Sequence, residues 1–588
     1  MDLTFLVLLP SSTLLKIVLN SIEFRLQNRK IFILVVTSLS TMVYLFTKKR
    51  AAGTYYYLGE NKKIKGKSVR IWQKYVGPAT TIKEILEGGK IPYEIDLLEF
   101  GLVASMLGMS DQLNFVNEVN KILPKRDQGL SMGEHLLLTI INRIDEPLSR
   151  NQFSKWFEHT MLKRRFIVKQ SYLSAQDFWN HWKRISQDSI DKIQEVLLER
   201  ILLLVSVKEL VFDPTNFTTY LEEHKNQNLA QFGHAKNGLK GLRQVNLSLL
   251  VTKESGVPLW HHTYDGNIND VTEFKEFINA LTKRIMQFSK QCKSIILILD
   301  KGNNSQNNIK NIDKKLHFYV VGSLKPSEHS DLFDIPLEQF NDDVVSKSGE
   351  KTFCVTATKE VYGGTKKIVV TYNEMLKYTQ KLRTDKAIQK ALNQLESLKG
   401  RIKDSAKSLD ELLIKVSKIA GKPYLRELIS YTLEQSLSGF DLSFQVNDGV
   451  YQQKCKVFGK NVLFTDNLSL TTQDVVKLYR EKNIVEEQIK NLKDTHVIRF
   501  TPMWCWTDQM IRVHAFTCVM ALLFLRLLVK KIGEAKLGLS QDQVFDQLKR
   551  IKLALLKVPA SDTVTVKLTR LNDTQRQLVN CLNLRRYL

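Results

Sequence analysis

Three apolar stretches decide the fold of this chain: residues 208–213 are KELVFD, residues 244–266 are QVNLSLLVTKESGVPLWHHTYDG, and residues 294–300 are SIILILD. The first and the third are short and aliphatic, which predicts buried strands that end at Asp213 and Asp300. The second predicts two strands joined by a glycine-containing turn. Together they indicate one sheet with two carboxylates at strand ends.

The segments that follow extend this pattern. Residues 269–288 have apolar residues at helical spacing, and residues 317–324, HFYVVGSL, predict another strand. The predicted order is three strands, a helix, a strand, a helix and a strand. This order favours a ribonuclease-H-like α/β layer over a doubly wound nucleotide fold, in which strands and helices would alternate strictly. No GxGxxG follows any of these strands in the sequence.

Changes in composition and period divide the rest of the chain. At about 150 residues per domain, a chain of 588 residues predicts three or four domains. The predicted segments are an N-terminal extension at 1–41, a small β module at 42–80, a helical DNA-binding region at 81–207, the first part of the α/β core at 208–325, an insertion of mixed β and helix at 326–470, the end of the core with a glutamate-bearing helix at 471–530, and a basic helical tail at 531–588. A solvated basic face on a purely structural bundle explains the pattern of the helical region about as well.

The charge balance indicates a polyanionic partner. Lys and Arg number 86 against 61 Asp and Glu, which gives a formal charge of +25. Nucleic acid is favoured over an anionic membrane surface. The six cysteines are far apart and have no zinc-ligand spacing, which is typical of reduced thiols in a cytosolic protein.

The N-terminal segment has an apolar run at residues 31–46, IFILVVTSLSTMVYLF. A helix of that length spans about 24 Å, less than the roughly 30 Å of a bilayer core. Asp2 and Glu23 argue against a secretory signal. Membrane insertion of residues 31–46 is therefore an alternative only, and a further reading is that Met42 is the functional start.

A third carboxylate is predicted on a helix. In residues 477–493, KLYREKNIVEEQIKNLK, a spacing of 100° per residue puts Tyr479, Lys482, Glu486 and Lys493 on one stripe about 60° wide. An ordinary surface helix with a Lys and Glu ladder is the alternative. Asp213 and Asp300 are likewise, taken singly, more often turn or capping residues than ligands.

This spacing of Tyr, Lys, Glu and Lys resembles the Tyr, Arg, Glu, Lys signature of DDE transposases in the insertion-sequence-four group. Blocks such as GTYYYLGENKKIKGKSVRIWQKYVG, SIILILDKGNNS and HVIRFTPMWCWTDQMIRVHAFTCVMALLFL resemble family blocks in the family order. The resemblance covers about Met42 to Val529 and is greatest to the long subgroup, which has a β-rich insertion before the catalytic Glu. Because relatives begin near GTYYYL, it also predicts that residues 1–41 are a mis-called N-terminal extension.

The resemblance implies a ribonuclease-H-like catalytic core with a β-rich insertion, preceded by a small β module and a helical N-terminal region. It further implies that three carboxylates are catalytic and bind Mg²⁺ or Mn²⁺, as two ions, and that three other side chains contact DNA phosphates. The implied catalytic and metal-binding residues are Asp213, Asp300 and Glu486. The implied phosphate-binding residues are Tyr479, Lys482 and Lys493.

Two positions depart from the family pattern. Lys482 replaces the signature Arg, which keeps the charge and loses bidentate phosphate geometry, and Pro214 follows the first Asp. Trp504 and Trp506 are possible base-stacking residues, as in hairpin-forming relatives, although core packing is the commoner role. His224, His234, His261 and His262 lack a His-x-x-x-His or Cys partner, which argues against a zinc site.

The resemblance implies a DNA transposase that binds the terminal inverted repeats of an insertion sequence and catalyses metal-dependent strand cleavage and strand transfer. The expected partners are double-stranded DNA, both element ends and target, and a second copy of the chain in a homodimeric synaptic complex. No membrane partner is expected, and the expected location is the nucleoid in the cytoplasm of a prokaryote. The alternative is a catalytically decayed or repurposed sequence-specific DNA-binding protein.

Overall fold

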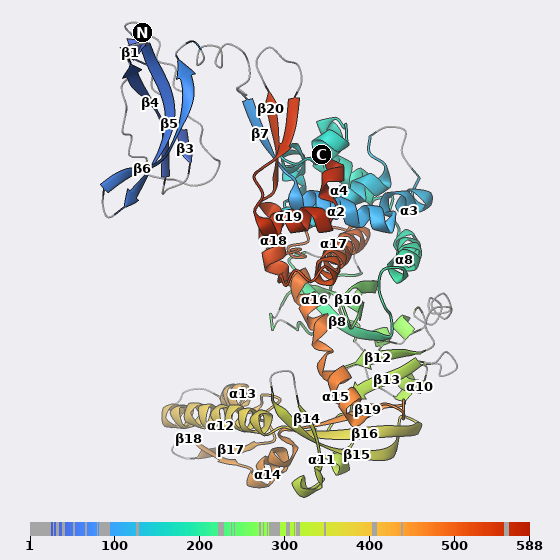
Figure 1. The fold of residues 1–588 in the computed structure, drawn as a ribbon. Coiled ribbons are helices and arrows are strands. Elements are labelled where there is room, and N and C mark those ends of the chain that lie inside the picture. Colours follow the sequence, from blue (N-terminus) through green and yellow to red (C-terminus); the bar gives the residue numbers. More distant parts are fainter. Residues whose placement is uncertain are drawn as a thin grey trace. The chain divides into compact units, whose positions relative to one another are not determined.

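The computed structural model describes residues 25–26, 29–30, 35–37, 41–50, 53–64, 67–78, 80, 94–124, 129–221, 228–236, 238–239, 241–269, 272–274, 276–278, 280, 294–300, 306–310, 312, 318–345, 349–402, 408–436, 439–557 and 564–588. The chain divides into two compact units (Figure 1). The first comprises residues 1–99, 551–571 and 588, and the second comprises residues 100–550 and 572–587.

The first unit is built from β-strands. Its four-stranded antiparallel sheet has the order β3-β4-β5-β6, and a second sheet has the order β21-β20-β7. The strands of this unit are β1 (Arg25–Leu26), β2 (Arg29–Lys30), β3 (Val35–Thr37), β4 (Thr41–Arg50), β5 (Gly53–Ile64), β6 (Lys67–Pro78), β7 (Glu94–Glu99), β20 (Lys552–Lys557) and β21 (Val564–Leu568).

Two expectations for these segments are wrong, and one alternative is ruled out. Within residues 31–46, the described residues form the antiparallel strands β3 and β4, so a continuous membrane helix is excluded there. The tail at 531–588 is not helical throughout, because β20 pairs with β21 and with β7. That pairing also puts strand β7 inside the segment predicted to be helical at 81–207. Strands β7 and β20 are more than 450 positions apart, so no local pattern indicates their pairing.

Helices dominate the N-terminal part of the second unit. They include α2 (Gly101–Leu113), α3 (Phe115–Ile122), α4 (Met132–Asp145), α5 (Phe153–Glu158), α6 (Leu162–Arg165), α7 (Ala175–Trp182) and α8 (Gln187–Leu202). Helix α4 begins at a capping box in which Ser131 and Glu134 satisfy each other's backbone N–H groups. Short 3₁₀ turns at Arg150–Gln152 and Gln170–Leu173 connect the later helices.

Helix α17 (Asp508–Glu534) is the central helix of the second unit. It contacts α2, α4 and α8 on one side and strand β11 and helix α16 on another. It is the one described helix long and apolar enough to cross a membrane, yet 89% of its apolar window is buried inside the protein. The apolar run at 515–525 is therefore part of the protein core. Helices α18 (Gln541–Lys549) and α19 (Asp573–Cys581) complete this unit.

The second unit contains a large mixed sheet with the order β11-β10-β8-β12-β13-β19-β16-β15-β14, in which β9 also pairs with β10. Strands β11, β10 and β8 are antiparallel, whereas β12 is parallel to both β8 and β13. The core strands are β8 (Glu209–Thr219), β9 (Gln231–Phe232), β10 (Arg243–Thr252), β11 (Pro258–Asp265), β12 (Ile295–Leu299) and β13 (Phe318–Ser323), with α10 (Gln306–Lys310) between the last two. Three antiparallel strands followed by two parallel ones form the mixed α/β layer that the sequence predicted.

The segment after β13 belongs to two substructures. Strands β14 (Asp342–Val345), β15 (Lys351–Val361), β16 (Gly364–Tyr372) and β19 (Lys460–Thr465) continue the core sheet, and α11 (Ser330–Phe333) contacts β19. Between β16 and β19, α12 (Glu374–Ile402) and α13 (Leu409–Ala420) pack on the hairpin β17 (Ile429–Ser436) and β18 (Gly439–Val446), beside α14 (Asp448–Val457) (Figure 1). Leu395, Leu412 and Leu442 belong to the buried cluster that joins these helices to the hairpin.

Candidate active site

Strands β8 and β12 bring the first two predicted carboxylates to one level of the sheet. The parallel register pairs Leu299 with Phe212, and Asp300 and Asp213 are the next residues on the two strands. Parallel neighbours with matched register carry their next side chains side by side. The pair predicted from separate strand ends therefore lies at one sheet edge.

The sequence predicted that the strand would end at Asp213, but the strand continues beyond this residue. Strand β8 continues to Thr219 and stays paired with β10, where Pro214 is opposite Ser248. On the other side, the described pairing with β12 stops at Phe212. A proline is tolerated in a strand where one side lacks a ladder partner, so Pro214 fits this position without disturbing the carboxylate before it.

The segment with the third carboxylate forms two helices and not the single helix predicted. Helix α15 (Thr472–Arg480) and helix α16 (Asn483–Lys493) meet at Glu481 and Lys482. At this junction the N–H of Lys482 donates to the carbonyl of Tyr479, and the N–H of Val485 donates to the carbonyl of Lys482. These i to i−3 bonds tighten the turn in the manner of a 3₁₀ helix. The placement of residues 479–493 at 100° intervals, which assumes one continuous helix, therefore describes their directions only approximately.

The tightened junction directs two side chains of the predicted stripe at Asp300. Nζ of Lys482 lies 2.9 Å from Oδ1 of Asp300 and 3.8 Å from Oε1 of Glu486. The Tyr479 hydroxyl donates to the same Asp300 oxygen at 3.3 Å. Glu486 lies in the first turn of α16, and its side chain is 59% exposed. Two of the three predicted carboxylates thus share one lysine.

Burial and charge tune these groups in opposite ways. Burial raises the pKa of Tyr479 to about 12, and the Asp300 carboxylate adds to this effect while Lys482 opposes it. Burial lowers the pKa of Lys482, but Tyr479 and the hydrogen-bonded Asp300 outweigh burial and raise it above its usual value. At neutral pH, Tyr479 is therefore a neutral donor and Lys482 a fixed cation, which are the forms suited to holding phosphate oxygens.

Lys493, the last residue of the stripe, reaches the other aspartate strand. Its Nζ donates to Oγ1 of Thr215 at 2.9 Å. Burial and the neighbouring cation Lys236 lower the pKa of Lys493, and the Asp213 carboxylate partly offsets them. Lys236 donates to the carbonyl of Pro214 at 2.5 Å. The Asp213 side of the sheet edge is therefore lined by two cations.

The donor set fits a hard divalent cation. Carboxylate oxygens are the ligands that Mg²⁺ and Mn²⁺ prefer, and Asp213 and Asp300 are side by side with Glu486 close to the lysine that Asp300 binds. The contact of the Lys482 ammonium with both Asp300 and Glu486 demonstrates that positive charge is favourable there. Among the described residues, the oxygens of all three carboxylates do not lie within 4.8 Å of one another.

Trp504 and Trp506 are not core residues, although core packing is the commoner role of such side chains. Their exposed fractions are 65% and 56%. The backbone of Trp504 is held with φ +49°, and its carbonyl accepts a hydrogen bond from Nη1 of Arg150 at 3.0 Å. A large aromatic side chain presented to solvent by a fixed backbone is available to a ligand.

A lysine that the sequence did not indicate anchors the helix junction. Nζ of Lys253, which follows β10, lies 2.7 Å from Oε2 of Glu209 and 2.7 Å from Oε2 of Glu481. Glu481 is the C-cap residue of α15. Lys253 therefore ties the junction beside Lys482 to the first residue of the Asp213 strand. The three residues are far apart in the sequence and have no shared spacing.

Comparisons with known proteins assign the family. Residues 208–524 match the model of the transposase DDE domain. No curated protein matches the chain. Among solved structures, the cryo-EM structure of a piggyBac transposase synaptic complex with hairpin DNA is similar at a TM-score of 0.36 and 9% identity, covering 78% of this chain and 82% of that chain, a likeness too weak to carry an argument. Because the matched domain spans more than half of the 588 residues and contains all three predicted carboxylates, the chain belongs to the DDE transposase family.

Proposed function

We propose that this transposase binds the terminal inverted repeats of an insertion sequence, cleaves DNA strands at the element ends and transfers the freed ends to target DNA in cut-and-paste transposition. The observation that carries the proposal is the register of Asp213 and Asp300 together with the contact of Lys482 with both Asp300 and Glu486. This arrangement concentrates three acidic side chains and a cation at one sheet edge of the matched domain.

In this proposal Asp213, Asp300 and Glu486 hold two Mg²⁺ or Mn²⁺ ions. When bound, such a pair activates a water or a DNA 3′-hydroxyl and stabilises the leaving oxygen of an in-line phosphoryl transfer. Lys482 and Tyr479 orient a phosphate on the Asp300 side, where both are fixed by the Asp300 carboxylate before DNA arrives. Such preorganised donors stabilise charge that develops in the transition state.

Lys493 contacts a phosphate on the Asp213 side. Its position on Thr215 and its lowered pKa, caused by burial and by Lys236, reflect an excess of positive charge that a phosphate relieves. The exposed Trp504 and Trp506 stack on a base displaced near the cut. We further propose membership of the long insertion-sequence-four subgroup, with residues 326–470 as its insertion.

The partners follow from this chemistry. The formal charge of +25 favours double-stranded DNA. Both element ends must be cut and joined in one assembly, so we propose a homodimer in the synaptic complex. The proposed location is the nucleoid in the cytoplasm of a prokaryote.

Strand cleavage of a labelled duplex tests the proposal, with the element's own terminal repeat and flank as substrate. We expect Mg²⁺-dependent nicking at the repeat boundary and a loss on the order of 10³-fold in Glu486→Gln, since a metal-bound site supplies several kcal/mol. Glu487→Gln is the matched control, because Glu487 is the next residue, has a similar exposed fraction of 55% and pairs with Arg526.

Both variants are expected to bind the repeat with wild-type affinity. Cleavage by Glu486→Gln at the wild-type rate would exclude the proposed role of Glu486. Binding of the repeat without cleavage by the wild type in Mg²⁺ or Mn²⁺ would instead identify a catalytically decayed or repurposed DNA-binding protein.

A further inference from the structure

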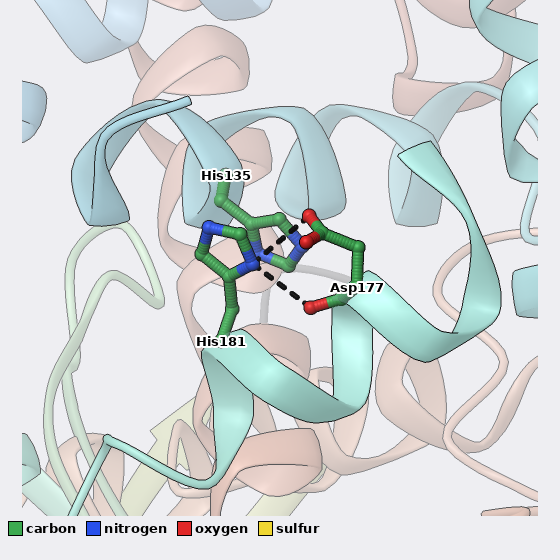
Figure 2. A group of neighbouring side chains, drawn as sticks. All are labelled: His135, Asp177 and His181. Carbon is green, nitrogen blue, oxygen red and sulfur yellow. Dashed lines mark hydrogen bonds and ion pairs between the residues drawn. The ribbon is translucent and has the colours of Figure 1, made fainter. Parts of the chain in front are cut away.

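A second group of metal-ligating side chains lies in the helical region, outside the matched transposase domain. His135 is on α4, and Asp177 and His181 are four residues apart on α7. One possible ligand atom from each lies within 4.8 Å of those of the other two. Figure 2 shows the two imidazole rings beside the Asp177 carboxylate.

The two histidines are buried, with exposed fractions of 1% for His135 and 2% for His181. Within the described part of the chain, neither ring nitrogen of His135 has a hydrogen-bond partner, and Nε2 of His181 has none. A buried polar atom without a partner costs about 1–3 kcal/mol. Three such atoms in one cluster require an explanation, and a bound ion satisfies two of them, one nitrogen from each histidine.

The hydrogen bonds of His181 leave one of its ring nitrogens open to a cation. Nδ1 of His181 lies 2.8 Å from the backbone oxygen of Asp177 and 3.1 Å from Oδ2 of that residue. A proton on Nδ1 that is donated to the carbonyl leaves the Nε2 lone pair for a metal, which is the usual tautomer arrangement of a ligating histidine.

Two neighbouring features bear on the site. The Arg150 guanidinium repels a cation, but its plane is held over the rings of Trp179 and Trp182, 4.5 Å from each, and the Asp177 carboxylate supplies the compensating charge. The rings of His135 and His181 stack with centroids 4.2 Å apart and planes at 3°.

We propose that His135, Asp177 and His181 bind one Zn²⁺ ion that ties α7 to α4. Two imidazoles and one carboxylate form a set typical of zinc, with water as the fourth ligand, whereas Mg²⁺ favours oxygen ligands alone. The site is separate from the three carboxylates of the transposase domain. The only local sequence signal is the Asp-x-x-x-His spacing of residues 177 and 181, since His135 joins through tertiary structure.

Metal analysis of the full chain tests this inference. Protein that is loaded with Zn²⁺ and dialysed without chelator should retain about one equivalent, measured by mass spectrometry of the metal. Asp177→Asn and His181→Gln should each lose it, with a dissociation constant at least about tenfold weaker. His159→Gln is the matched control, because His159 is exposed in the same region and its Nδ1 contacts the carbonyl of Lys155.

Three further readouts make the result decisive. Asp300→Asn should retain the zinc, which separates this site from the predicted active site. Cobalt substitution should give the visible absorption of a four-coordinate site in the wild type and not in Asp177→Asn, a variant of nearly unchanged shape. Chelator should lower the melting temperature of the wild type but not of Asp177→Asn. Retention of no zinc by the wild type, or equal retention by all variants, would overturn the inference.

Discussion

Nζ of Lys482 lies 2.9 Å from Oδ1 of Asp300, a residue 182 positions earlier in the chain. The contact joins the helix junction before Glu486 to the end of strand β12, and it occupies one oxygen of a carboxylate that we propose as a metal ligand. Lys482 is thus held at the site before a phosphate is present. Its role is best tested with one variant that removes the charge of the side chain and one that keeps it.

Lys482→Gln should lower the rate of strand cleavage by roughly 10- to 100-fold, because the variant loses one charge-assisted contact to the reacting phosphate. Lys482→Arg keeps the charge, adds bidentate geometry and should stay within a few-fold of the wild type. Single-turnover cleavage under saturating protein measures both. Equal rates in Lys482→Gln and the wild type would contradict a role for this cation.

Lys493→Gln should reduce the salt dependence of DNA binding. Each phosphate contact contributes a slope of about 0.9 in a plot of log affinity against log salt concentration, so the variant should lose about one unit. Thr215→Val removes the Oγ1 atom that accepts a hydrogen bond from Lys493, but Lys493 keeps its charge. This variant should therefore leave the slope unchanged. Fluorescence anisotropy across a salt series measures this, and an unchanged slope in Lys493→Gln would show that the residue contacts no phosphate.

The Lys253 contacts predict coupling between strand β8 and the helix junction. Lys253→Met leaves Glu209 and Glu481 facing each other without the cation that both contact, so cleavage should fall more than DNA binding. Adding Glu481→Gln removes the uncompensated charge and should restore part of the rate. A double-mutant cycle on the cleavage rate should give a coupling energy of about 0.5–3 kcal/mol. Strict additivity of the two substitutions would argue against the coupling.

Trp504→Ala and Trp506→Ala should weaken stacking on a displaced base by about 1–3 kcal/mol each if the side chain makes that contact. Both are exposed, so folding stability should change by no more than about 0.5 kcal/mol. A 2-aminopurine at the cleavage boundary reports base displacement through its fluorescence. Tyr220→Ala is the control, because Tyr220 is an aromatic residue with an even larger exposed fraction, 79%. Identical fluorescence in all three variants would rule out stacking by either tryptophan.

Glu118 predicts a pH-dependent stability of the helical region. The hydrogen bond from Lys121, with those from Arg200 and Asn114, lowers the pKa of Glu118 to about 2 although burial opposes this. A lowered carboxyl pKa contributes stability that is fully present above the unfolded value, near 4.5, and is lost as pH falls from there toward 2. Glu118→Gln should therefore lower the melting temperature at pH 7 by roughly 2–6 °C.

That difference should shrink progressively below pH 4.5. Scanning calorimetry at several pH values measures it, and Glu199→Gln is the control because this residue is exposed on α8. A melting difference for Glu118→Gln that is the same at pH 7 and pH 3 would show that lost packing, and not the carboxylate charge, causes the effect.

Local sequence patterns indicate the features that depend on neighbouring residues. Period-two and aliphatic runs indicated β8, β10, β11, β12 and β13, and these strands form the predicted mixed layer. The spacing from Tyr479 to Lys493 indicated the residues that reach the aspartate strands, and the family match contains them. Such patterns are readable because side chains two or four positions apart share a face whatever the rest of the chain does.

The features that join distant residues became visible in the three-dimensional fold alone. Strand register places Asp300 beside Asp213. Helix packing breaks the helix at Glu481, so that Lys482 contacts Asp300. It also places Lys253 between Glu209 and Glu481. The approach of His135 to α7 and the pairing of β20 with β7 likewise join segments that no local period relates. Their physical basis is the burial of apolar surface, which stabilises contacts between residues that are far apart in the sequence.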